Sequence, residues 1–154
     1  MSPNTMSPRG GTMRRYETVF ILRPSQSEDE INAIIENTKN IILNDHGSII
    51  DLNKWGMKKL AYTIKKEIQG QYVFCDFAGT PASVAEFERK FRIDDAVLKY
   101  LTIKTADAIS EEEIGKAIAE ADAKQAAQAR ETSEEDEHAV VEVIETIEET
   151  TDEE

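Results

Sequence analysis

The spacing of apolar residues divides the middle of the chain into six elements. Runs rich in strand-forming residues occupy 16–22, 48–66, 71–78 and 97–104, and turn-forming or helix-forming segments separate them. Two segments between these runs have apolar residues at helical spacing, namely Ile31, Ile34, Ile35, Thr38, Ile41 and Ile42 in the first, and Val84, Phe87 and Phe91 in the second. The order strand, helix, strand, strand, helix, strand predicts a two-layer α+β sandwich, with one antiparallel sheet and both helices on one face.

Residues that begin and end helices support these boundaries. Ser27 and Glu30 form a capping box before the first helix. Thr80 can cap the second helix, with Pro81 at its first position. Gly47 is predicted to end the first helix in a left-handed conformation.

The long run 48–66 is predicted to be one strand that bends or bulges at Gly56. Residues 67–70 are predicted to turn the chain into the third strand. Asp94 and Asp95 are expected in the connection before the fourth strand.

A sheet with helices on one side only leaves its second face uncovered. On a period of two, the residues predicted to face the helices are Val19, Ile21, Val73, Cys75, Phe77, Val97, Leu101 and Ile103. Those predicted to face the other way are Tyr16, Thr18, Phe20, Tyr72, Phe74, Leu98 and Tyr100. Monomers rarely expose so large an apolar face, so we predict that it docks a partner through Phe20, Tyr72, Phe74, Leu98 and Tyr100. The alternative is that a bulge inverts this assignment of faces.

The charge is unevenly distributed along the chain. The formal net charge is −13, yet residues 13–105 contain 14 Lys and Arg against 13 Asp and Glu, and residues 106–154 contain 3 against 18. The acidic composition therefore describes the tail and does not exclude a nucleic-acid partner for the core. We predict a flexible leader over 1–12, a compact domain over 13–105 and an acidic tail over 106–154. The tail is expected to be helical over about 111–130 and disordered after Glu131.

Residues Lys54–Lys66 contain five lysines and no acid. Cations beside aromatic residues on a stiff strand suit a negatively charged polymer better than a small substrate. The alternative is a solvated edge strand whose lysines prevent aggregation.

Few residues are arranged for other chemistry. The chain has no phosphate-binding glycine loop and no pair of CxxC motifs, and its two histidines, His46 and His138, are far apart. We therefore predict no enzymatic activity, no cofactor and no metal site. The single Cys75 lies in an apolar run and is interpreted as a core residue. The absence of a signal-peptide pattern or an apolar run of membrane-spanning length predicts a soluble, cytoplasmic protein.

The basic stretch and its flanks resemble a known family. Gly56-Met57-Lys58-Lys59-Leu60-Ala61-Tyr62-Thr63-Ile64-Lys65 is similar to the signature of bacterial small-subunit ribosomal protein six. Met13-Arg14-Arg15-Tyr16-Glu17, Gly70-Gln71-Tyr72 and Phe91-Arg92-Ile93-Asp94 resemble that family as well. The resemblance covers residues 13 to about 105, and the leader and the tail lie outside it.

This resemblance implies a ferredoxin-like fold and no enzymatic activity. It implies a structural component of the small ribosomal subunit, bound to the central domain of small-subunit rRNA together with small-subunit ribosomal protein eighteen, with no membrane and no small-molecule substrate as partners. The implied rRNA-facing residues are Arg14, Arg15, Tyr16, Lys54, Lys58, Lys59, Tyr62 and Arg92. The alternative function is a ferredoxin-like regulatory or small-molecule-binding module. An acylphosphatase-type enzyme of the same topology ranks last, because residues 23–27 lack a glycine-rich phosphate cradle.

Overall fold

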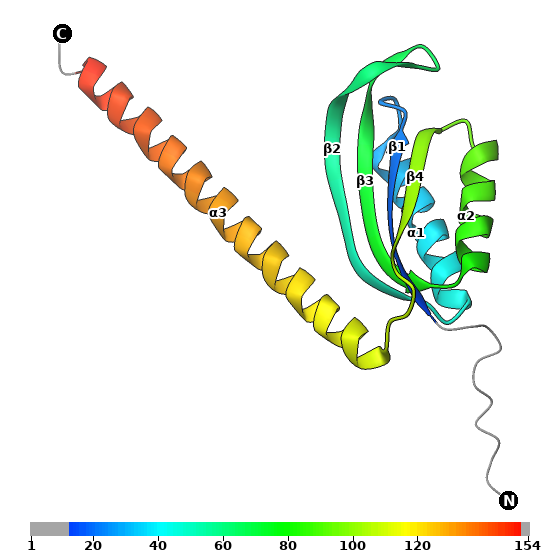
Figure 1. The fold of residues 1–154 in the computed structure, drawn as a ribbon. Coiled ribbons are helices and arrows are strands. Elements are labelled where there is room, and N and C mark those ends of the chain that lie inside the picture. The colour runs from blue at the N-terminus through cyan, green and yellow to red at the C-terminus, as the bar shows by residue number, and fades with distance from the viewer. Residues whose placement is uncertain (1–12, 152–154) are drawn as a thin grey trace, which may run out of the picture. The chain divides into compact units, whose positions relative to one another are not determined.

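The computed structural model describes residues 13–151, with side chains described as far as Ser133. Its elements are β1 (Arg14–Leu22), α1 (Glu28–Asn44), β2 (Ser48–Ile64), β3 (Glu67–Gly79), α2 (Pro81–Ile93), β4 (Val97–Ala106) and α3 (Glu111–Thr151). The four strands form one antiparallel sheet in the order β2-β3-β1-β4. Helices α1 and α2 cover one face of this sheet (Figure 1). The predicted ferredoxin-like sandwich is therefore confirmed.

The main core lies between the sheet and the two covering helices. The predicted stripe of α1 is buried at Ile31, Ile35, Thr38 and Ile42, and that of α2 at Phe87 and Phe91. Aromatic rings join the two layers, because the ring of Phe87 lies 5.6 Å from that of Phe77 on β3. Cys75 is 1% exposed in the same cluster, which confirms its interpretation as a core residue.

Capping interactions fix the ends of the two covering helices. The side chain of Ser27 accepts a hydrogen bond from the backbone of Glu30 and the Glu30 side chain accepts one from Ser27, so the capping box is confirmed. Thr80 caps α2 as predicted. The carboxylate of Asp45, which follows α1, accepts hydrogen bonds from the hydroxyls of Thr80 and Ser83 and so ties the end of α1 to the start of α2.

The left-handed residue after α1 is His46, with φ 64°, and the prediction of Gly47 at that place was wrong by one position. Gly47 is required for a different reason, which is close packing. A Cβ atom at this position would lie 2.6 Å from the carbonyl oxygen of Ala78 and 2.7 Å from a side-chain carbon of Ile42. The space around position 47 is therefore too small for any side chain.

The β2–β3 hairpin is irregular at two places. Gly56 has φ +82° beside a register shift, which confirms the predicted bulge. The turn consists of Lys65 and Lys66, both with positive φ, and β3 already begins at Glu67. The prediction of a turn over 67–70 was wrong, because Ile64 pairs with Glu67 and closes the hairpin around two residues.

The predicted faces are correct in β3 and at Val97 and Leu98 of β4, and they are inverted in β1 and at Tyr100, Leu101 and Ile103 of β4. Tyr16, Thr18 and Phe20 of β1 lie opposite Phe77, Cys75 and Val73, on the face that the helices cover. Val19 and Ile21 therefore point to the uncovered face. In β4 a register shift opposite Ile21 and Leu22 leaves Val97 on the helical face but places Tyr100 there as well. Such an irregularity reverses the alternation, which is why Leu101 and Ile103 are exposed instead of buried.

The predicted leader, residues 1–12, lies outside the described residues. Helix α3 begins at the capping box of Ser110 and Glu113 and continues to Thr151.

The segment that leads into α3 and the first turns of this helix pack against one end of the sheet. Ile109, Ile114 and Ala117 are buried against Ile50 and Ala78, and the backbone N–H of Ile109 donates to the carbonyl oxygen of Met13 over 2.9 Å. The chain divides into two compact units after Ile118.

Candidate functional site

The exposed lysines of β2 lie beside aromatic rings. The backbone alternation places Lys58 opposite Gly70 and on the same sheet face as Tyr72. The Nζ atom of Lys58 is 4.9 Å from the ring centre of Trp55 and 5.9 Å from that of Tyr72. Both distances fall within the range of cation–π attraction, which orders the lysine while leaving its charge available. Lys59 is also exposed.

The uncovered side of the sheet carries a continuous group of apolar and aromatic residues, which we call the open face. Its members are Val19, Ile21, Trp55, Tyr72, Phe74, Leu98, Leu101 and Ile103. The rings of Trp55 and Phe74 stack at 5.4 Å with an interplanar angle of 7°. Leu101 and Ile103 are 64% and 49% exposed. A hollow of about 290 Å³ lies over β1 and β4, lined by Val19, Ile21, Lys99, Tyr100 and Leu101.

Three predicted site residues lie in the core instead of on a binding surface. Phe20 is 1% exposed and its ring lies 4.7 Å from that of Phe91. Tyr16 is 6% exposed and stacks on Phe77. Tyr100 packs against the core and against the ring of Phe91. The inverted phase of β1 and β4 is the physical cause of these errors. Among the predicted partner-facing residues, Tyr72 and Phe74 are partly exposed on the open face, whereas Leu98 lies on the same side but is 6% exposed, in a cluster with Ile21 and Leu60.

Two predicted cations are paired with acids of the chain itself. The guanidinium of Arg15 donates to both carboxylate oxygens of Asp76, over 3.1 and 2.8 Å. The Nζ atom of Lys54 lies 2.6 Å from a carboxylate oxygen of Glu28 and also donates to the side chain of Asn32 on α1. These pairs draw Arg15 and Lys54 toward the protein and weaken their attraction for an external anion.

The remaining predicted residues are accessible to different degrees. Arg14 is partly buried near Asp107, whose pKa lies below its ordinary value mainly because the ammonium of Lys104 is hydrogen-bonded to it, with a smaller contribution from Arg14. Arg92 is exposed on α2, in the layer opposite the open face. Tyr62 is 59% exposed, and its hydroxyl accepts a hydrogen bond from Lys99.

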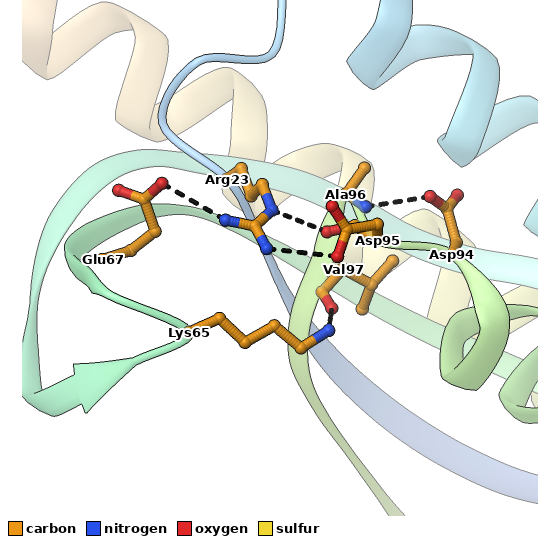
Figure 2. Close-up of polar contacts among 7 residues, drawn as sticks. All are labelled: Arg23, Lys65, Glu67, Asp94, Asp95, Ala96 and Val97. Carbon is orange, nitrogen blue, oxygen red and sulfur yellow. Dashed lines mark hydrogen bonds and ion pairs between the residues drawn. The ribbon is translucent and has the colours of Figure 1, made fainter.

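Sequence reasoning missed the residues that hold the end of the β2–β3 hairpin (Figure 2). Arg23, which follows β1, bridges Glu67 on the hairpin and Asp95 in the connection before β4. The ammonium of Lys65 reaches the carbonyl oxygen of Val97. The sequence offers no signal for these contacts, because the partners are 32 to 72 positions apart. The contacts of Trp55 with Phe74 and Lys58 were not predicted either, although Trp55 lies between Lys54 and Lys58 in the sequence.

The described side chains offer little for catalysis or metal binding. Burial raises the pKa of the Cys75 thiol to about 12, which keeps it protonated and unreactive. Within residues 13–133 no cluster of His, Cys, Asp and Glu is suited to hold a metal ion. The hollow between α1 and α2 has a volume of only about 70 Å³, well below a metabolite site. None of the helices described for this chain is long and apolar enough to span a membrane.

The fold and the surface together define a small ferredoxin-like protein whose exposed features are an aromatic sheet face and a basic strand. Comparison with known families identifies it further. Residues 15–104 match the family described as Ribosomal protein S6. The chain therefore belongs to the ribosomal protein S6 family of the small ribosomal subunit, and its location is the cytoplasmic ribosome.

Individual relatives agree with this assignment. The chain is 55% identical to small ribosomal subunit protein bS6 of Desulfotalea psychrophila over 116 residues, which are 75% of this chain and 73% of that protein. It is 44% identical to the bS6 protein of Caldanaerobacter subterraneus over 95 residues, covering 62% of this chain and all of that protein. The crystal structure of 30S ribosomal protein S6 from Thermotoga maritima is similar with a TM-score of 0.56 and 31% identity, over 60% of this chain and 88% of that chain.

Proposed function

We propose that this protein is a non-enzymatic structural component of the small ribosomal subunit. In this proposal it binds the central domain of small-subunit rRNA together with small-subunit ribosomal protein eighteen. The observation that carries the proposal is the juxtaposition of an exposed lysine pair on β2 with an uncovered aromatic sheet face. The two features suit two different partners. Lys58 lies on the same face of the sheet as the aromatic residues, and Lys59, the next residue, is exposed on the other side of the strand.

The lysine pair is suited to the phosphates of RNA. Lys58 and Lys59 are exposed, and neither forms an ion pair with another described residue. A duplex RNA hides its base edges in a narrow major groove, so recognition relies on shape and on the backbone. Exposed cations on a stiff strand can neutralise neighbouring phosphates without a costly rearrangement.

The open face is suited to the protein partner. Leu101 and Ile103 on β4 are 64% and 49% exposed, and Val19 on β1 lies between Leu101 and Phe74 of the Trp55–Phe74 stack. Exposed aromatic residues within an apolar patch are typical anchors of protein interfaces. A partner that covers this patch would bury its apolar surface while the lysines remain at its border.

We rank the predicted rRNA-facing residues by their exposure and by the ion pairs that they form. Lys58 and Lys59 are the principal members, and Arg14 and Tyr62 lie at accessible positions beside the sheet. Arg15 contributes only to the extent that RNA phosphate competes with Asp76. Lys54 and Arg92 are weaker candidates, since Lys54 is paired with Glu28 and Arg92 lies on the helical layer. Tyr16 is withdrawn from the proposal because it is buried.

The test is replacement of Lys58 and Lys59 by alanine in the full chain. Binding to a central-domain rRNA fragment is measured by filter binding at several salt concentrations. Each lost phosphate contact lowers the salt slope by roughly one, so the double variant is expected to flatten the slope by about two and to weaken binding at low salt. Binding of protein eighteen is expected to change little.

The matched control removes two lysines from the helical layer, Lys39→Ala with Lys90→Ala, and should leave the slope unchanged. This control has the same net charge as the test variant and loses its charge from the helical layer, where Lys39 is paired with Glu36 and Lys90 is exposed. An equal effect of the two variants, or a slope unaffected by Lys58→Ala with Lys59→Ala, would contradict the assignment.

A further inference from the structure

The turn of the β2–β3 hairpin has an unusual combination of sequence and conformation. Lys65 and Lys66 have φ values of 47° and 69°. A two-residue turn with positive φ at both positions favours Asn-Gly, because glycine adopts this conformation without strain and asparagine with little. Two lysines carry a conformational cost there that Asn-Gly would remove. Conformations of this kind persist where surrounding contacts enforce them, and they concentrate at functional sites.

Contacts to the neighbouring connection hold this turn in place (Figure 2). The Nζ atom of Lys65 donates to the carbonyl oxygen of Val97 over 3.1 Å. The guanidinium of Arg23 donates to the carbonyl oxygen of Asp95 over 2.7 Å and to its carboxylate over 3.2 Å. The same guanidinium reaches the carboxylate of Glu67, the first residue after the turn, over 3.4 Å. The turn is thereby fastened to the segment between α2 and β4.

Neither lysine of the turn forms an ion pair with a described carboxylate, although acids lie nearby. Arg23 is shared between the carboxylates of Glu67 and Asp95. Asp94 accepts a hydrogen bond from the backbone of Ala96 over 3.0 Å. The ammonium of Lys65 is bound to a neutral carbonyl oxygen and to no carboxylate. Lys66 is exposed and forms no hydrogen bond or ion pair with any other residue of the described part of the chain.

We propose that Lys65 and Lys66 form a second phosphate-binding point for RNA, presented by a rigid hairpin turn. The inference rests on the proposed function, because it assumes that the protein binds RNA. RNA is favoured over a protein partner because Lys58 and Lys59 lie on the same hairpin, so the cations follow one another along one element. A chain of phosphates offers a matching row of negative charges, and a turn that is already ordered loses little entropy on binding.

The decisive variant replaces Lys65→Asn and Lys66→Gly together in the full chain. This change removes both charges and installs the sequence that the turn conformation favours. It also removes the hydrogen bond of Lys65 to Val97, and relief of two positive-φ positions is expected to exceed the loss of this single partly buried contact. We expect the melting temperature to rise by a few degrees while the slope of rRNA binding against salt falls by about two. A variant that is more stable and yet binds RNA more weakly cannot be explained by damage to the fold.

Single substitutions separate the charge from the conformation. Lys66→Gln is expected to lower the salt slope by roughly one, and Lys66→Arg to preserve it. The variant Lys39→Ala with Lys90→Ala, which loses the same net charge from the helical layer, is expected to behave as the wild type.

Each outcome bears on one of the two proposals. If the wild type binds the rRNA fragment and Lys65→Asn with Lys66→Gly binds with the same slope, this inference is overturned and the proposed function stands. If the wild type itself does not bind, the proposed function fails. Loss of binding to protein eighteen with unchanged RNA binding would assign the turn to the protein partner and overturn the inference. A melting temperature that does not rise would remove the argument from strain, and the inference with it.

Discussion

Replacement of Phe20 and Phe74, one at a time, by alanine tests which side of the sheet is the core. The two residues lie on adjacent strands, but on opposite faces. Phe20 is 1% exposed and its ring lies 4.7 Å from that of Phe91, within the cluster between sheet and helices. Phe74 is partly exposed on the open face, where its ring stacks on that of Trp55.

The expected losses of stability differ severalfold. Removal of a fully buried phenylalanine costs about 3–5 kcal/mol, which combines the lost transfer free energy with the cavity left behind. Phe74 loses an aromatic pair worth about 0.5–1.5 kcal/mol and only part of a side chain's burial, so its replacement is expected to cost about 1–2 kcal/mol. A domain of this size is stable by about 5–15 kcal/mol, and both variants should therefore retain a measurable folded population.

Urea unfolding followed by circular dichroism gives the stability of each variant, and an unchanged m-value confirms that the comparison is valid. Binding of protein eighteen is measured on the same preparations. Phe74→Ala is expected to weaken it about tenfold or more, as for a central interface residue. Ile93→Ala serves as the control, because Ile93 is also apolar and is 74% exposed on the helical layer. Equal costs at Phe20 and Phe74, or unchanged partner binding by Phe74→Ala, would refute this assignment of the faces.

Two further predictions concern the core and the helix ends. Hydrogen bonds from Thr80 and Ser83 hold the pKa of the Asp45 carboxyl below its ordinary value of 3.8. A lowered native pKa stabilises the fold above that ordinary value, and the contribution is lost as the pH falls through the lowered one. Asp45→Asn is therefore expected to cost about 1 kcal/mol or less at neutral pH, because solvent screens this partly exposed group, and progressively less as the pH falls below 3.8, as measured by urea unfolding; a cost independent of pH would contradict this. Cys75, with its thiol pKa raised to about 12, should react with a thiol reagent at pH 8 only as fast as the protein unfolds, and rapid labelling of the native protein would show that this site opens locally.

The sequence predicted the elements of this fold well because their signals are local. The capping boxes at Ser27 and Ser110, the cap at Thr80 and the apolar stripes of α1 and α2 each involve residues a few positions apart. The faces of β1 and β4 could not be predicted in the same way. Both faces of these strands are apolar, so alternation alone gives no direction, and the register shift beside Leu22 changes the phase of β4.

Only part of the candidate site could be predicted, because only some of its signals are local in the sequence. Lys58 and Lys59 are visible as a basic pair in the sequence, and the structure leaves both exposed. Arg15 and Asp76 are 61 positions apart in the sequence, and Lys54 and Glu28 are 26 positions apart. No local sequence pattern predicts these two ion pairs. Lysine rarely adopts the positive φ values found at Lys65 and Lys66. The sequence therefore favoured a turn at residues 67–70, which contain a glycine.

The packing of the first turns of α3 has a consequence for how the protein can be shortened. The family match ends at residue 104, yet Ile109, Ile114 and Ala117 cover Ile50 and Ala78 at one end of the sheet. Truncation after residue 104 would remove these three residues and expose Ile50 and Ala78 to solvent. The shortened protein would then have an apolar surface patch that the full chain buries, and we expect it to self-associate through this patch. The compact unit that contains the sheet extends to Ile118, so the end of the family match at residue 104 falls inside this unit.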